Sequence, residues 1–183
     1  LTVLQRTAQF TFPAGNRPLT AEDMTAARAN WGSAVEKMYA NFGGFPVDNN
    51  PSRSALEATP EEREALYEEL WQRGGFGFFL KLYNDIAINE QSNQSLADFV
   101  RNKIREIVCD PETAKKLLPD HFVITKRPIL DDGYFETYNR DNVTLVDLRD
   151  DPIERFTPTS VVTRTGEHPI DMLVLATGYD AIS

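Results

Sequence analysis

The chain has 183 residues, of which 41% are hydrophobic and 26% charged, as in globular domains rather than disordered, collagen-like or disulfide-rich chains. Its net charge of -9 argues against a nucleic acid partner, because non-specific phosphate binding needs an excess of lysine and arginine. No window approaches the ~18 uncharged apolar residues of a membrane span. The first residues lack the pattern of a secretory signal, so we expect a cytoplasmic protein.

The sequence lacks the cysteine and histidine side chains that a metal site or thiol catalysis would need. The sequence holds one cysteine, Cys109, and two histidines, His121 and His168, which lie far apart along the chain. A structural zinc site is built from several such ligands at close spacing. We therefore expect no metal site and no thiol nucleophile.

The first forty residues are predicted to form a strand and then a helix. Residues 1–6 have the β-branched and apolar alternation of a strand. Thr20 followed by Asp23 is a helix start, and we expect this helix to end before Gly43. Its apolar face would consist of Met24, Ala27, Trp31, Val35 and Met38.

A capping box predicts the next helix. Thr59 and Glu62 are spaced for reciprocal hydrogen bonds, with Pro60 at the first helical position. Arg73-Gly74 is a stop signal. We expect Trp71 in this helix, like Trp31 before it, to be a packing residue.

Three more helices are predicted before residue 120. A helical pattern covers residues 76–88, and apolar side chains repeat at spacings of three and four over residues 96–108. Asp110-Pro111 then opens a short helix that Pro119 ends.

From His121 onward the sequence favours strands. Four β-branched or apolar runs are separated by proline, glycine and aspartate, at residues 122–125, 143–146, 161–163 and 172–175. The order of elements indicates an α/β fold. We expect a helical insertion, residues 20–119, within a sheet-based domain made of residues 1–19 and 120–183.

The end of the first strand carries candidate chemistry. In dinucleotide-binding folds an arginine at the end of the second strand accommodates the NADP phosphate, and Arg6-Thr7 stands at such a position. None of the ten glycines forms G-x-G-x-x-G, so the position by itself also fits an ordinary surface arginine.

Two later segments are further candidates. Lys126-Arg127 precedes Pro128, and its guanidinium suits an oxyanion or a peroxide while its ammonium suits a phosphate. Ala176-Thr177-Gly178 follows a predicted buried strand, and its small side chains allow a ligand close to the backbone. The aromatic residues of 75–83 are expected mainly in the core, with an apolar substrate pocket as the alternative.

Taken in order, these segments resemble the flavin-dependent Baeyer-Villiger monooxygenases, the group that includes cyclohexanone and phenylacetone monooxygenases. The resemblance implies an α/β fold, a partial dinucleotide-binding (Rossmann-like) domain with a large helical insertion. The segments that carry it are residues 1–10 with Pro13-Ala-Gly-Asn-Arg17, Ile86-Ala-Ile-Asn89, Thr125-Lys-Arg-Pro128, Asn139-Arg-Asp-Asn-Val143 and Asp171 through Asp180.

The resemblance also implies cofactors and residue roles. Family members use FAD and NADPH, and through a flavin C4a-peroxide they convert a ketone and O2 into an ester or lactone. It gives Arg127 the role of stabilising the peroxide. Around NADP it places Arg6, Thr7 and Lys126 at the 2'-phosphate, and Ala176, Thr177 and Gly178 beside the nicotinamide nucleotide.

Only part of a family enzyme is covered by the resemblance. The glycine-rich turns and the family's fingerprint motif with histidine and tryptophan are missing from the sequence. We therefore expect the remainder of the parent chain, with its FAD domain, to be required, and expect no monooxygenase activity from these 183 residues alone. We also expect an exposed sheet edge and exposed apolar surface.

Two other functions stay open. A flavin monooxygenase acting on nitrogen or sulfur, or an NADPH-dependent disulfide reductase, shares the two-dinucleotide architecture, although Lys126-Arg127 and the long insertion argue against both. A non-catalytic helical interaction module would use the face around Met24, Trp31, Val35 and Met38, and it would explain the acidic charge.

Overall fold

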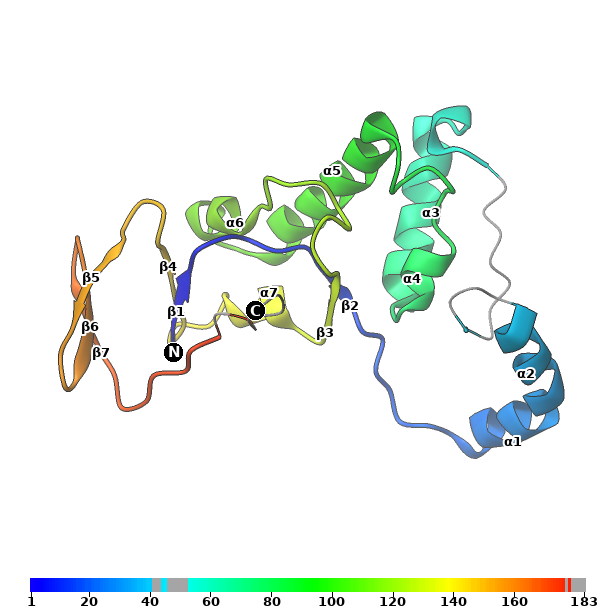
Figure 1. Cartoon of the computed structure of the whole chain (residues 1–183), viewed down its shortest axis with the longest axis horizontal. Coiled ribbons are helices and arrows are strands. Elements are labelled where there is room, and N and C mark those ends of the chain that lie inside the picture. Colours follow the sequence, from blue (N-terminus) through cyan, green and yellow to red (C-terminus); the bar gives the residue numbers. More distant parts are fainter. Residues whose placement is uncertain (41–43, 46–52, 177, 179–183) are drawn as a thin grey trace, which may run out of the picture. The chain divides into compact units, whose positions relative to one another are not determined.

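The computed structural model describes residues 1–40, 44–45, 53–176 and 178. The chain forms two compact units (Figure 1). The first, the sheet unit, combines Leu1–Thr7 with Asp141–Ser183, and the second, the helical unit, is Ala8–Arg140. Together their elements make a mixed α/β fold, as the sequence predicts.

Two parallel strands bring the beginning of the sheet unit together with its later part. Strand β1 (Thr2–Gln5) pairs with β4 (Thr144–Asp147), with Gln5 opposite Asp147. The terminal ammonium of Leu1 donates to the carbonyl oxygen of Asn142 at 2.7 Å. The strands predicted at 1–6 and 143–146 are confirmed.

A three-stranded antiparallel sheet completes the sheet unit. Its order is β5 (Ile153–Phe156), β6 (Ser160–Thr163) and β7 (Glu167–Pro169). All four residues of the central strand β6 are buried, which confirms the strand predicted at 161–163. Both outer strands are largely exposed, and their polar sequences gave no strand signal.

The helical unit contains a second pair of parallel strands, β2 (Thr11–Pro13) and β3 (Ile129–Asp131). Its longest helix is α5, and the predicted helices at 59–73, 96–108 and 110–119 are confirmed. The bounds of its helices are α1 Ala21–Ala29, α2 Trp31–Ala40, η1 Ala55–Glu57, α3 Pro60–Arg73, α4 Gly77–Leu80, α5 Glu90–Ile107, α6 Pro111–Leu117 and α7 Tyr134–Thr137.

Side-chain caps explain why these helices begin where they do. Thr20 and Asp23 form the capping box of α1, and Thr59 and Glu62 form that of α3. Asp110 accepts from the backbone of Thr113 at the start of α6. Each cap satisfies backbone donors that the first helical turn leaves without partners.

Aromatic side chains form the core of the helical unit. The Phe12 ring is fully buried, and its centroid lies 4.7 Å from those of both Phe78 and Phe79. Trp71 is also buried, at 6.2 Å from Phe12, as the sequence predicts. These contacts join strand β2 to helices α3 and α4.

Two glycines allow the backbones of β2 and α3 to cross at close range. Gly74 ends α3 with φ of 64°, and a Cβ there would lie 2.8 Å from the Cα of Gly15. The next amide, that of Gly75, donates to the carbonyl oxygen of Pro13 at 2.8 Å. No other residue type fits this crossing without displacing backbone.

The single helix predicted from Thr20 to before Gly43 is wrong in part. Asn30 interrupts it as the C-cap of α1, with non-helical φ of -96° and ψ of 4°, and its side-chain amide donates to the carbonyl oxygen of Ala26. Neither α1 nor α2 has a buried residue, and Trp31 is 68% exposed, so its predicted packing role is also wrong. Residues 41–43, where the end was expected, lie outside the described part.

The helix predicted at 76–88 is limited to the four residues of α4. Beyond it, Asp85 forms a turn in which its carbonyl oxygen accepts from Asn89 at 2.8 Å. The Asp85 carboxylate, itself buried, accepts from the backbone of Ala55 and from the hydroxyls of Ser54 and Ser92. Burial raises the pKa of Asp85, but these hydrogen bonds outweigh it and hold the pKa below its ordinary value.

No described helix is long and apolar enough to cross a membrane. The described residues also contain no group of three histidine, cysteine, aspartate or glutamate side chains that could hold a metal ion.

Candidate functional site

Arg6 and Thr7 stand at the carboxyl end of β1, as predicted. The pairing with β4 continues past the strand, since the amide of Leu148 donates to the carbonyl oxygen of Gln5 at 2.8 Å. Arg6 is exposed and makes no hydrogen bond or ion pair with any residue that the structure describes. Ligands of α/β folds bind at this edge of a parallel sheet.

A second arginine, which the sequence analysis missed, lies at the same edge. Arg149 contacts the buried carboxylate of Asp147, with Nη2 at 2.7 Å from Oδ2, and 45% of its side chain is exposed. The available signal was an acid at the end of the 143–146 run with an arginine two residues later. The edge therefore carries two guanidinium groups: Arg149 forms an ion pair with Asp147, whereas Arg6 forms none with the residues that the structure describes.

The segment before Lys126 is a turn and not the strand predicted at 122–125. Asn93, buried on α5, explains the difference, because its side chain bonds both polar groups of the Val123 backbone at 2.9 and 3.0 Å. Its amide also donates to the carbonyl oxygen of Ile86 at 2.8 Å. Ile124 then has φ of 74°, which no strand allows.

Lys126 and Arg127 are both exposed after this turn. Neither side chain forms an ion pair within the described part of the chain. The carbonyl oxygen of Arg127 lies 3.5 Å from the Nε2 amide of Gln9. Two cations are thus presented to solvent on a segment held from both sides.

The third predicted segment lies near the end of the sheet unit. Residues 172–175 are exposed and form no strand, so the buried strand predicted there is wrong for this chain. The apolar run has no strand partner among the described residues and therefore lacks the burial that its sequence suggests. Ala176 is exposed, Gly178 has φ of 92°, and Thr177 lies outside the described residues.

The predicted site residues fall into two groups. Arg6, Thr7, Ala176 and Gly178 belong to the sheet unit, whereas Lys126 and Arg127 belong to the helical unit.

The aromatic run around α4 divides between core and surface. Phe78 is fully buried, whereas Phe76 is 45% exposed and contacts Phe45 at 4.8 Å and Phe79 at 5.7 Å between ring centroids. The core interpretation holds for Phe78. The exposed Phe76 leaves part of this aromatic run in contact with solvent.

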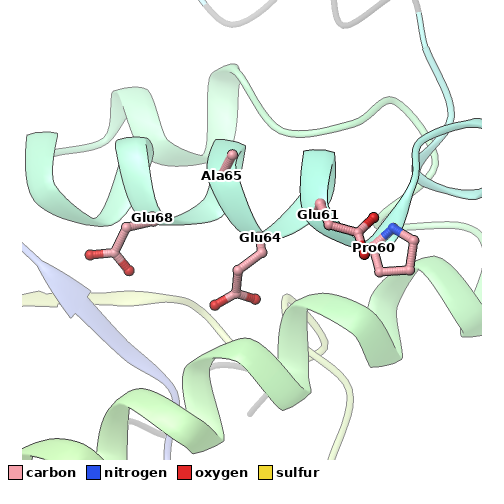
Figure 2. A pocket seen from close by; sticks show the side chains of 5 residues that line it. All are labelled: Pro60, Glu61, Glu64, Ala65 and Glu68. Atoms are coloured by element: carbon pink, nitrogen blue, oxygen red, sulfur yellow. The ribbon is translucent and has the colours of Figure 1, made fainter.

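Three carboxylates line an open surface cavity along α3. It measures about 620 Å³ and is lined by α3 residues alone, with Glu64 and Glu68 projecting from the same side of the helix (Figure 2). Lys103 donates to Glu68 at 2.6 Å and, with Gln72, lowers the pKa of that carboxyl. Carboxylates repel phosphates, so this cavity does not suit a nucleotide.

Comparisons with known proteins identify the family. No family model matches the chain. A Baeyer-Villiger monooxygenase of Pseudooceanicola batsensis is 41% identical over 184 residues, which cover all of this chain and 33% of that protein. Cyclohexanone 1,2-monooxygenase of an Acinetobacter species is 40% identical, with 100% and 34% covered. The chain belongs to the Baeyer-Villiger monooxygenase family, and it spans about a third of the relatives that it matches.

Two further relatives extend the comparison. A phenazine N-monooxygenase of Lysobacter antibioticus is 40% identical over 189 residues, covering 100% of this chain and 34% of that protein. The crystal structure of a complex of OTEMO with FAD and NADP matches with a TM-score of 0.92 and 39% identity, over 98% of this chain and 34% of that one. The fold of this chain therefore matches about a third of the structure of OTEMO, which was crystallised with FAD and NADP.

Proposed function

We propose that this chain is the greater part of the NADPH-binding domain of an FAD- and NADPH-dependent monooxygenase that converts ketones and O2 into esters or lactones. Residues 20–119 would be a helical insertion in a Rossmann-like domain formed by residues 1–19 and 120–183. Family membership supports the activity, and the parallel β1–β4 pair with Arg6 at its carboxyl edge supports the nucleotide.

The described residues fit NADP by their charge and position. A 2'-phosphate needs cations that are not already neutralised, and in a chain of net charge -9 both Arg6 and Lys126 stand without a described carboxylate partner. We assign them, with Thr7, to that phosphate. Ala176-Thr177-Gly178 is assigned to the nicotinamide nucleotide, since small side chains and the positive φ of Gly178 permit close approach of the backbone.

Arg127 is assigned to the flavin side of the reaction. FAD, when bound and reduced, supplies the activated oxygen that is transferred to the ketone. The Arg127 guanidinium is planar and always charged, so it stabilises negative charge that develops on oxygen atoms in the transition state. The 183 residues alone would not oxygenate ketones, because the sequence holds no glycine-rich turn for a pyrophosphate.

Two alanine variants of the full-length parent test these assignments. We expect Arg127→Ala to abolish ester formation, a loss of at least about 100-fold by analogy with other oxyanion donors, while NADPH still reduces the flavin. We expect Lys126→Ala to lower the preference for NADPH over NADH. Arg105→Ala and Lys115→Ala, exposed on α5 and α6, are matched controls. Normal ester formation by Arg127→Ala would refute the catalytic assignment.

Oxygenation of nitrogen is a second candidate function. The phenazine N-monooxygenase is as similar to this chain as cyclohexanone 1,2-monooxygenase is, at 40% identity each. Product analysis of the parent enzyme decides between the two. Esters from a cyclic ketone support the first function, whereas an N-oxide from a phenazine with no ester supports the second.

A further inference from the structure

The Lys126-Arg127 segment has two attachments of different kinds. On its upstream side the Asn93 side chain holds the Val123 backbone through two hydrogen bonds of 2.9 and 3.0 Å and donates a third, of 2.8 Å, to the carbonyl oxygen of Ile86; we call this set of three bonds the Asn93 clamp. On its downstream side the contact is that of Gln9 with the carbonyl oxygen of Arg127. The orientation of the Gln9 amide therefore affects where the two cations stand.

Hydrogen bonds fix which way the Gln9 amide points. Its Oε1 accepts from the backbone N–H of Phe10 at 3.0 Å and lies 2.9 Å from Nε2 of His121. With the oxygen engaged on that side, the Nε2 amide faces Arg127. Because Gln9 Oε1 can only accept, His121 must donate from Nε2.

The other ring nitrogen of His121 has no hydrogen-bond partner in the described part of the chain. Nδ1 is buried, without a hydrogen bond to any described residue. A neutral ring with its proton on Nε2 leaves only a bare lone pair there, whereas an imidazolium would bury an N–H without an acceptor. The geometry therefore selects one protonation state and one tautomer.

The groups around the ring favour the same state. His121 contacts the ring of Phe10 at 5.2 Å between centroids, and Arg101 stands over the Phe10 ring at 5.7 Å. Burial lowers the pKa of His121 from its ordinary 6.5, Lys126 and Arg101 lower it further, and Asp120 opposes them. A second positive charge beside Lys126 is thus disfavoured.

We propose that His121 is a positioning residue for nucleotide recognition: as a neutral ring protonated on Nε2 it orients Gln9, which in turn fixes the backbone at Arg127 and the neighbouring Lys126. This inference rests on the proposed role of Lys126 at the 2'-phosphate. His121 touches neither substrate nor cofactor and acts through Gln9.

The first test is nuclear magnetic resonance of the ¹⁵N-labelled full-length parent. We expect the imidazole of His121 to be neutral at pH 7.5, with its proton on Nε2, and to titrate below 6.5. A proton on Nδ1, or an imidazolium at pH 7.5, would overturn the proposal. This measurement does not depend on catalysis, so it separates the proposal from the proposed function.

The second test uses kinetics of the same parent enzyme. His121→Leu removes the donor, and Gln9→Glu still accepts from His121 but cannot donate to Arg127. Each is expected to raise KM for NADPH about fivefold, the effect of one lost hydrogen bond, and to leave KM for NADH unchanged. A general distortion of the nucleotide site would raise KM for NADPH and KM for NADH alike, and that result, or no change in either, would contradict the proposal.

Two further variants serve as rescue and control. His121→Gln retains an amide donor and should return KM for NADPH to within about twofold of the wild-type value. His168→Leu makes the same change at the other histidine, whose Nε2 lies 3.1 Å from Thr163 in the sheet unit. We expect it to leave both KM values unchanged, and a change equal to that of His121→Leu would count against a specific role for His121.

Discussion

The two units differ in how they bury their apolar residues. In the helical unit, strand β2 and helices α3 to α5 close a core in which Phe12, Tyr67 and Phe78 are almost completely buried, whereas α1 and α2 of the same unit bury no residue. The sheet unit buries its central strand β6 but leaves residues 172–175 in contact with solvent. One part of the chain can therefore bury its own apolar residues, while another part leaves apolar residues that need a further surface to cover them. Exposed apolar surface of this kind is what the sequence predicts.

Removal of the Asn93 clamp should have the largest effect on the helical unit. Asn93→Leu leaves the backbone polar groups of Val123 and the carbonyl of Ile86 buried without partners, and we expect a loss of about 4 kcal/mol in the free energy of unfolding. Both tryptophans lie in this unit, so fluorescence during urea denaturation reports it selectively. Asn102→Leu, exposed on the same helix, is the control and should change stability by less than about 0.5 kcal/mol.

The second largest loss of stability is expected where the backbones of Gly15 and Gly74 cross at close range. In Gly74→Ala the new Cβ meets Gly15 and the carbonyl oxygen of Pro13 within 3 Å, and its backbone keeps a positive φ, so we expect a loss of about 3 kcal/mol. Gly77→Ala, with no atom near the added methyl group, should instead gain about 0.5 kcal/mol in helix α4. Equal denaturation midpoints for the two variants would show that the crossing does not limit stability.

The smallest effect on stability is expected from substitutions in the exposed residues 172–175 of the sheet unit. Val174 is 75% exposed, so Val174→Ser should change amide protection in β5–β7 by less than about 0.5 kcal/mol. Val161→Ser, at a fully buried position of β6, should reduce the same protection by about 2 kcal/mol. If both substitutions reduced protection equally, the run would be buried in solution and the difference between the two units would disappear.

Short-range signals in the sequence predicted the structure well. The helix starts predicted at Thr20 and Thr59 are confirmed because their partners lie three residues away and the hydrogen bonds form within one helical turn. The strands at 1–6 and 161–163 follow from the local preference of β-branched residues.

Long-range partners explain why the run 122–125 and the candidate residue Arg149 were not predicted correctly, whereas the failure at Trp31 has a local cause. The run 122–125 has the composition of a strand, but Asn93, far away in the sequence, takes both backbone groups that a neighbouring strand would need. Trp31 was expected to pack, yet Asn30 ends the helix before it and no described element covers it. The same limit applies to the site, since Arg149 became a candidate only when the pairing of β1 with β4 was known.

The pairing of β1 with β4 has a consequence for the order of folding. All of residues 8–140 stand between the two strands in the sequence, so their pairing closes a very long loop, and the entropy cost of closure grows with its length. Within that loop β2 already pairs with β3, which brings Thr11 next to Ile129 and shortens the effective distance. We therefore expect the helical unit to form first and the β1–β4 ladder to assemble late, as a slow step of high contact order.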